Sequence, residues 1–268
     1  TRKVKALGFK PAIWIGAACP TDTQIRKEKK EWFIEYSHRM DWAAPLDVSI
    51  HEVRNYMKDA FAWFVAEGFE GIKHDFWSYA YEDSHDLLSF KEKSGYEYRE
   101  WWTKNMRDVL GYDGYIGTAC DISMGNPFLG KYFNHYRFGI DIASGKWEEI
   151  RTTFFWGVCA LSGHCGDLYI PNCDSVGFLP GLNDVDYTFV VNFAMISRSF
   201  VETSGKFSAV DENDKRLQML QKASKYLNNG EDVYFAKFDY RAKGQNFPAF
   251  LYLKSHVDSP EQNESFRT

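Results

Sequence analysis

The sequence predicts an α/β fold, made of most of a (β/α)₈ TIM barrel followed by the start of a C-terminal antiparallel β domain. Short apolar runs alternate with longer segments of helical periodicity over most of the chain, which is typical of parallel βα units. No glycine-rich G-x-G-x-x-G turn follows these runs, which disfavours the alternative, an open doubly wound sheet. After Gly230 the pattern changes to two short strands that flank a polar turn, and this change predicts the β domain.

About six βα units fit the chain, whereas a closed barrel needs eight in roughly 250 residues. We therefore expect one or two N-terminal units to be absent from these 268 residues. The chain opens on Thr1, and its basic stretch Thr1–Lys10 is typical of the end of a helix, so we expect a piece of a longer protein. Two domains are predicted: the incomplete barrel over residues 1–229 and the beginning of a β-sandwich-like domain over residues 230–268.

The first elements carry the clearest signals. Pro11–Ala18 is short, apolar and bounded by proline, which predicts a buried strand. Apolar residues at helical spacing predict a helix over Asp47–Glu67. Ser49 and Glu52 form a capping-box pattern at the start of this helix, and Gly68 is expected to end it.

The remaining elements continue the alternation. The predicted strands are Gly71–Trp77, Tyr115–Ala119, Tyr136–Ile140, Leu168–Ile170 and one near Ser204–Ala209, followed by the antiparallel pair Val233–Asp239 and Ala249–Lys254. The predicted helices are Tyr96–Leu110, Lys146–Leu161, Val185–Phe200 and Asn213–Leu227.

Composition excludes several classes of function. The net charge of −5 lacks the basic excess that phosphate neutralisation requires, so we expect no nucleic-acid partner. No apolar run approaches the roughly 18 to 20 residues that cross a bilayer, so no membrane partner is expected. Five cysteines are too few for a disulfide scaffold and show no zinc-ligand spacing. The aromatic content of 18% fits either a core rich in large side chains or a cleft lined with flat apolar faces, as in carbohydrate sites.

Polar residues gather where the barrel strands end, the place where βα loops build active sites. Lys73 and Asp75 alternate along one strand and therefore share a face. Arg137 and Asp141 have a similar arrangement on a later strand. Two carboxylic acids on separate strand ends, one kept charged and one able to carry a proton, are what glycoside hydrolysis needs. The alternative for Lys73 and Asp75 is an ion pair that holds a loop.

Four sequence blocks resemble clan D glycoside hydrolases, families 27 and 36. GIKHDF resembles their nucleophile strand with its K-x-D motif, and RFGIDIASGKW resembles their acid/base strand, R-x-G-x-D. LDVSIHEVRNYM resembles the L-D-x-x-x-x-E-V-x-x-Y segment before the nucleophile strand, and KPAIWIGA resembles the strand written F-G-L-W-x-x-P. The order and spacing match family 36 α-galactosidases over about residues 5–227. The resemblance implies a retaining enzyme that removes terminal α-galactosides from oligosaccharides through a glycosyl-enzyme intermediate.

The resemblance also implies a role for individual residues. Asp75 would be the nucleophile, and Asp141 would be the acid/base residue, with the two carboxylates about 5 to 6 Å apart, the retaining separation. Lys73 would hydrogen-bond sugar hydroxyls, and Arg137 would help to keep the nucleophile ionised. Further substrate-binding candidates, each with a structural alternative in the core or a loop, are Trp14, Trp77, Cys120 and Asp174. No metal or organic cofactor is expected, because two carboxylates suffice.

Departures from the family pattern leave the sugar open. His74 stands between Lys73 and Asp75 where relatives have an apolar or aromatic residue, Asn172-Cys173-Asp174 replaces Asn-Asp-Pro-Asp, and the usual Ser-Gly-Gly after Cys120 is missing. The alternatives are an α-N-acetylgalactosaminidase, a raffinose-synthase-like transglycosidase and a catalytically silent carbohydrate-binding relative. The expected partner is an oligosaccharide or glycoside; a homo-oligomer and the cellular compartment are left open.

Overall fold

A computed structural model of the chain gives its fold. The described residues are 1–20, 22–34, 43–76, 87–118, 130–137, 141–142, 146–152, 170–175, 182–196, 200–203, 208, 210–228, 233–239, 249–256 and 259–267. The chain divides into two compact units, Thr1–Arg137 and Phe138–Thr268. The domain boundary expected at residue 229 stays a prediction.

The first unit is built on a parallel sheet. Its strands, in spatial order, are β1 (Ala12–Gly16), β4 (Gly71–Asp75), β5 (Tyr115–Thr118) and β6 (His135–Arg137). Spatial order follows chain order, and long helices connect β1 to β4 and β4 to β5, as βα units require. Each of the four strands predicted in this half of the chain has a counterpart: β4 and β5 lie within their predicted ranges, and β6 begins one residue early, with residues 138–140 outside the described residues. The prediction of a buried first strand is wrong, because the residues of β1 are exposed or half-buried.

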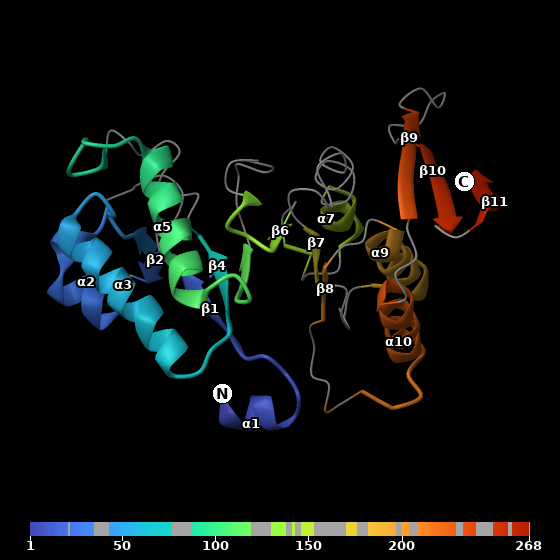
Figure 1. Cartoon of the computed structure of the whole chain (residues 1–268), viewed down its shortest axis with the longest axis horizontal. Helices are drawn as coiled ribbons and strands as arrows, with labels where there is room; N and C mark the ends of the chain where they lie inside the picture. Colours follow the sequence, from blue (N-terminus) through green and yellow to red (C-terminus); the bar gives the residue numbers. More distant parts are fainter. Residues whose placement is uncertain are drawn as a thin grey trace. The chain divides into compact units, whose positions relative to one another are not determined.

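Two long helices cover one face of this sheet (Figure 1). They are α3 (His51–Ala66) and α5 (Gly95–Leu110), which pack against each other. Beneath them, Ile72 of β4 and Ile116 of β5 lie side by side in register, each with no exposed surface. Phe61 of α3 meets Trp102 of α5 edge to face, with ring centroids 5.6 Å apart. This apolar layer accounts for part of the high aromatic content as core.

The capping box expected at the start of α3 is wrong. The helix begins at His51 after Ile50, and no side chain of the described residues caps its N-terminus. The Ser49 hydroxyl instead donates to Asp47 Oδ1 at 2.5 Å, and its oxygen accepts the N–H of Phe90 at 3.0 Å, a backbone group outside the helix. The capping box occurs at α5, where Ser94 and Glu97 cap each other's backbone. Gly68 ends α3 as predicted, at a φ of 86°.

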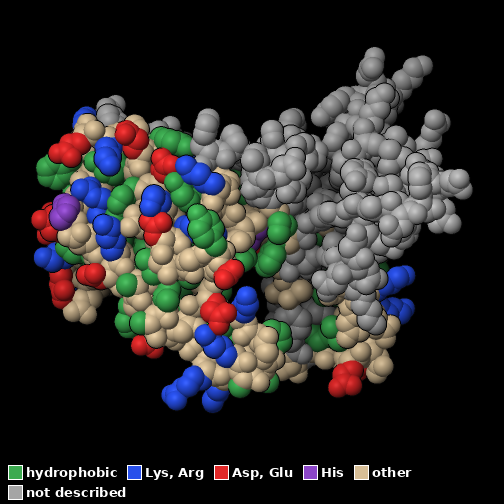
Figure 2. All heavy atoms as spheres, viewed as in Figure 1, with side chains coloured by type: hydrophobic (Ala, Val, Ile, Leu, Met, Phe, Trp, Pro, Cys, Tyr) green, Lys and Arg blue, Asp and Glu red, His purple; other side chains and the backbone are tan. Residues whose placement is uncertain are grey.

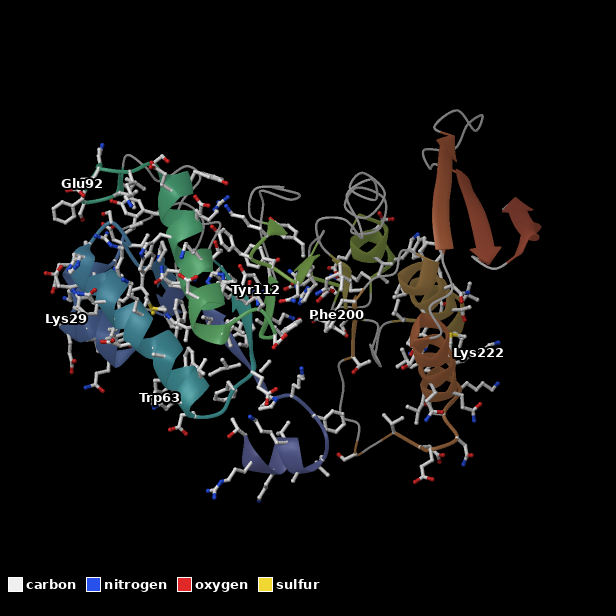
Figure 3. The ribbon with its side chains drawn as sticks, viewed as in Figure 1. Lys29, Trp63, Glu92, Tyr112, Phe200 and Lys222 are labelled. Carbon is white, nitrogen blue, oxygen red and sulfur yellow. The ribbon has the colours of Figure 1, made fainter. Side chains whose placement is uncertain are left out.

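Shorter elements complete the first unit. They are α1 (Arg2–Ala6), β2 (Ala18–Pro20) paired antiparallel with β3 (Ala43–Pro45), α2 (Gln24–Glu28) and the 3₁₀ helix η1 (Lys30–Trp32). The predicted strand Pro11–Ala18 is therefore split between β1 and β2. Figure 2 shows basic and acidic side chains interspersed with hydrophobic ones on the face of this unit that is in view. Trp63 projects from α3 with 56% of its surface exposed (Figure 3).

The second unit also begins with parallel strands and helices. Its elements are α7 (Trp147–Thr152), β7 (Ile170–Ser175), α9 (Asp184–Ile196), β8 (Phe200–Glu202) and α10 (Lys215–Asn228). Strands β7 and β8 pair in parallel, with Asn172 opposite Phe200. Phe200, predicted to end a helix, begins β8 instead, so this strand comes earlier than the one expected near residues 204–209, most of which lie outside the described residues. Helices α9 and α10 pack together, and Arg216 binds Asp184 at 3.1 Å.

An antiparallel sheet closes the chain. Its strands are β9 (Val233–Asp239), β10 (Ala249–His256) and β11 (Ser259–Arg267), with β10 in the middle. The first two confirm the predicted pair. Strand β11 was not predicted, because its sequence SPEQNESFR is polar and contains proline. Within the described residues, none of the helices is both long and apolar enough to span a bilayer.

Candidate functional site

The face of the first sheet that is turned away from α3 and α5 collects the candidate residues. Along β4, Ile72 and His74 point toward the helices, so Lys73 and Asp75 point to the opposite face. The parallel register places Trp14 beside Lys73 and Gly16 beside Asp75. Neighbouring residues of paired strands project to the same side of a sheet, so Trp14 shares this face with the two polar residues.

Asp75 ends β4 with its carboxylate held by two donors. The residue is only 8% exposed. Trp14 Nε1 donates to Oδ2 at 3.1 Å, and the backbone N–H of Phe76 donates to Oδ1 at 2.9 Å. The Asp75 carbonyl oxygen accepts from the N–H of Ala17 at 3.0 Å, which ties the end of β4 to the end of β1. The donors fix the orientation of the carboxylate and stabilise its negative charge.

The backbone turns sharply directly after Asp75. Phe76 has a φ of 57°, a left-handed conformation that costs a non-glycine residue about 1–3 kcal/mol and is concentrated at functional sites. The turn brings the Phe76 ring to the edge of Trp14, with centroids 6.0 Å apart at 85°. A Cβ on Gly16 would lie 3.3 Å from the Phe76 ring, so glycine makes room for it. Trp14 remains 54% exposed and presents an aromatic face next to Asp75.

A glycine on β5, opposite Lys73, makes room for a histidine side chain of the next strand. Gly117 lies opposite Lys73 on one side and His135 of β6 on the other. A Cβ on Gly117 would overlap His135 Nε2, so only glycine lets the imidazole lie across β5. His135 is fully buried, hydrogen-bonded to the Tyr115 hydroxyl and stacked on the Tyr115 ring at 5.1 Å. Neither Gly117 nor His135 was among the predicted site residues; a glycine inside a predicted strand was the available signal.

His74, the unusual residue between Lys73 and Asp75, belongs to the other face. It is fully buried and packs on Trp102 of α5 at a centroid distance of 5.3 Å. Burial lowers the pKa of His74 to about 3, so the imidazole is neutral near pH 7. The His74 side chain therefore belongs to the core beneath the helices and not to the face that carries Asp75.

Arg137 is the last described residue of β6 and is 4% exposed. Its backbone N–H donates to the Thr118 hydroxyl at 3.4 Å. Strand alternation puts Arg137 on the same side as His135, two residues earlier, and so on the face that carries Lys73 and Asp75. The register thus gathers Trp14, Lys73, Asp75 and Arg137 on one face of one sheet.

Asp141 and Asp174 belong to the second unit. Asp141 is exposed, whereas the next residue, Ile142, is fully buried. The N–H of Ile142 donates to Asp174 Oδ2 at 2.8 Å. Asp174 is 6% exposed and has a φ of 66°. Asp75 lies in the first unit, so its separation from Asp141 stays a prediction.

Two of the predicted site residues, Trp77 and Cys120, lie outside the described residues. In the described part of the chain, no group of three or more His, Cys, Asp or Glu side chains could hold a metal ion. The candidates that share one face of the first sheet are a carboxylate, a lysine, an arginine and an indole.

No protein-family model matches the sequence, and no curated protein matches it. Solved structures do match its fold. A GH27 β-L-arabinopyranosidase from Geobacillus stearothermophilus superposes with a TM-score of 0.70 at 16% identity, over 96% of this chain and 61% of that chain. An α-galactosidase from Thermus thermophilus, in complex with p-nitrophenyl α-D-galactopyranoside, gives 0.60 at 13% identity, over 88% and 50%. The GH36 α-galactosidase AgaA from Geobacillus stearothermophilus gives 0.62 at 12% identity, over 96% and 36%.

These matches establish the fold. The chain has a parallel sheet with helices, an α/β fold similar to the TIM barrels of clan D glycosidases from both family 27 and family 36. It spans about 61% of the length of the first of these structures, and less of the others. At such low identity, activity and specificity do not follow from the fold.

Proposed function

We propose that this chain carries the catalytic carboxylates of a retaining glycoside hydrolase that removes terminal α-galactosides from oligosaccharides. The observation that carries the proposal is the setting of Asp75. A buried carboxylate stands at the C-terminal end of a parallel strand, oriented by Trp14 Nε1 and the Phe76 N–H, with an exposed indole beside it. Active sites of (β/α)₈ enzymes lie at this end of the strands.

In the first step, Asp75 attacks the anomeric carbon of the sugar while Asp141 donates its proton to the glycosidic oxygen. The bond between the anomeric carbon and that oxygen breaks, the aglycone leaves as an alcohol, and the sugar becomes an ester of Asp75. In the second step, Asp141 accepts a proton from water, and the oxygen of that water attacks the anomeric carbon. The ester bond breaks, Asp75 is released as a carboxylate, and the anomeric configuration is retained.

The surroundings of the two acids suit these different tasks. Asp75 must be held in a fixed orientation toward the anomeric carbon, and the hydrogen bonds from Trp14 Nε1 and the Phe76 N–H support this role. Lys73, on the same face and half-buried, is assigned to the sugar hydroxyls, and Trp14 to a wall of the site. Asp141 must take up and release a proton in each cycle, and its exposed position gives it access to water.

A panel of p-nitrophenyl glycosides on the full-length protein tests the proposal. Hydrolysis of the α-galactoside, and a fall of about 10³-fold or more in kcat for Asp75→Asn with binding retained, are expected. Unchanged turnover by Asp75→Asn would end the assignment of the nucleophile. Hydrolysis of α-glucosides without α-galactosides would end the assignment of the sugar.

A second substrate has specific support. The two structures with TM-scores of 0.70 and 0.71 are of a β-L-arabinopyranosidase, one of them in complex with arabinose. A β-L-arabinopyranoside has the ring configuration of an α-D-galactopyranoside without the hydroxymethyl group at C5. The panel therefore includes p-nitrophenyl β-L-arabinopyranoside, and a higher kcat/KM for it than for the α-galactoside would favour this specificity.

A further inference from the structure

Asp174 is attached to the backbone next to Asp141. Its Oδ2 accepts a hydrogen bond of 2.8 Å from the N–H of Ile142. That N–H belongs to the peptide bond that leaves Asp141, so the contact fixes the peptide plane next to the acid/base candidate. Ile142 is fully buried whereas Asp141 is exposed. The chain is thus anchored immediately after a side chain that is open to solvent.

Asp174 is itself held by its neighbours. Its backbone N–H donates to Asn172 Oδ1 at 2.7 Å, and Asn172 Nδ2 donates to Glu202 Oε1 of β8 at 2.7 Å. Asn172 is fully buried. A line of hydrogen bonds therefore runs from β8 through β7 to the Ile142 N–H, within a single unit of the chain.

The backbone of Asp174 adopts a strained conformation. Its φ of 66° lies in the left-handed region, which aspartate tolerates better than most residues but which still costs free energy. Such conformations persist where the surroundings impose them, typically at functional sites. Only 6% of Asp174 is exposed, which leaves little of it to meet a sugar at the rim of a site.

We infer that Asp174 is a positioning residue for Asp141, which it holds through the Ile142 N–H, and not a substrate contact. The inference rests on the proposed function, in which Asp141 is the general acid. A general acid delivers its proton only when it lies within hydrogen-bond reach of the leaving oxygen, and a misplacement of about 1 Å costs up to 10²-fold in rate. Asp174 fixes the position of Asp141 through the Ile142 N–H, and the hydrogen bonds that join Asp174, Asn172 and Glu202 hold Asp174 in place.

The choice of leaving group tests this inference. An alkoxide leaving group must be protonated as it departs, whereas p-nitrophenoxide departs without a proton. A misplaced general acid therefore slows the cleavage of methyl α-galactoside and not that of p-nitrophenyl α-galactoside. Asp174→Gly relieves the left-handed strain and removes the carboxylate. We expect kcat/KM for methyl α-galactoside to fall about 10- to 100-fold, and for p-nitrophenyl α-galactoside to change by about threefold or less.

Two further variants sharpen the result. Asp174→Asn keeps an oxygen that can accept from the Ile142 N–H, so it is expected to restore most of the activity on the methyl glycoside. Asn172→Ala removes the acceptor for the Asp174 N–H, and a smaller selective loss is expected, which keeps the inference testable should Asp174→Gly fail to fold. Asp211→Asn is the matched control, because Asp211 accepts the N–H of Asn213 at 2.7 Å in the approach to α10.

The outcomes separate this inference from the proposed function. Equal losses on both substrates would show that Asp174 binds the sugar, and no loss on either would show that the anchor is dispensable; each overturns the inference. If Asp141→Ala shows the leaving-group split and Asp174→Gly does not, the positioning role alone fails. If Asp141→Ala shows no split, the proposed acid fails and the inference fails with it.

Discussion

Trp14 and Asp75, 61 residues apart in sequence, are joined by a hydrogen bond of 3.1 Å from the indole Nε1 to the carboxylate Oδ2. The bond links the middle of β1 to the end of the adjacent parallel strand, β4. The same indole leaves 54% of its surface exposed beside the carboxylate. One side chain thus orients the proposed nucleophile and offers an aromatic wall to a ligand.

Replacing Trp14 with phenylalanine separates these two roles, because it keeps an aromatic ring and removes the donor. A hydrogen bond to a charged group contributes about 1.5–3 kcal/mol, so kcat is expected to fall about 10- to 100-fold with KM changed little. Steady-state kinetics on p-nitrophenyl α-galactoside measure this. Trp63→Phe, on the exposed side of α3, is the control and should match the wild type. A rise in KM with kcat unchanged would show that Trp14 only binds the sugar.

His74 makes the stability of the fold depend on pH. Its folded-state pKa is about 3, lowered by burial from an ordinary value of 6.5, so the unfolded chain binds more protons between these values. The free energy of unfolding is therefore expected to fall as the pH drops from about 6.5 toward 3. His74→Phe, which keeps an aromatic ring and removes the titratable group, should remove this part of the pH dependence. Urea unfolding at pH 7, 6 and 5 measures the slope.

The control for His74 is His51→Gln, since His51 is exposed on α3. This variant should keep the wild-type slope. A slope that His74→Phe leaves unchanged would mean that other groups set the acid sensitivity.

Gly117 is expected to be intolerant of any side chain because of His135. A Cβ would overlap the imidazole, and overpacking of this kind costs about 1–3 kcal/mol of unfolding free energy. Gly117→Ala in the wild type and in a His135→Ala background forms a double-mutant cycle, read by urea unfolding. The cost of the alanine should shrink when the imidazole is gone. An equal cost in both backgrounds would mean that another group, such as the Tyr115 hydroxyl 2.6 Å from the same Cβ, and not His135, requires glycine.

The capping box lies at α5 and not at α3, where the sequence pattern predicted it, and its contribution to stability can be measured. Ser94→Ala is expected to lower the unfolding free energy by about 1 kcal/mol, through the loss of the Glu97 N–H acceptor. Ser94→Asp, which keeps a capping oxygen, should restore most of it, and thermal unfolding compares the two. Should Ser94→Ala match the wild type in its Tm, the cap would contribute nothing to stability.

The strands that carry the proposed site could be predicted because their signals are local. Short apolar runs between polar turns place β1, β4 and β5, and the alternation of side chains along a strand is enough to put Lys73 and Asp75 on one face. The order of the sequence blocks also indicated a clan D fold, which the solved structures support independently. Family 36 in particular, and the sugar, stay predictions.

The features that could not be predicted depend on contacts between distant residues. Ser49 has a capping pattern, but its oxygen accepts the N–H of Phe90, 41 residues away, and its hydroxyl donates to Asp47. The need for Gly117 comes from His135, which reaches it from the next strand. Asp174 was expected to bind substrate, and its contact with the Ile142 N–H could not be predicted because the two residues are 32 positions apart in the sequence. Contacts of this kind produce no periodic pattern in the sequence.

The most direct test of the central claim is to trap the glycosyl-enzyme intermediate. The full-length protein is incubated with 5-fluoro-α-D-galactopyranosyl fluoride, which transfers its sugar to the nucleophile and slows release, and peptide mass spectrometry then locates the label. We expect one added 5-fluorogalactosyl group as an ester of Asp75, and none on the Asp75→Asn variant. A label on another carboxylate, or release of inverted product without a labelled peptide, would contradict the claim that Asp75 is the nucleophile of a retaining glycosidase.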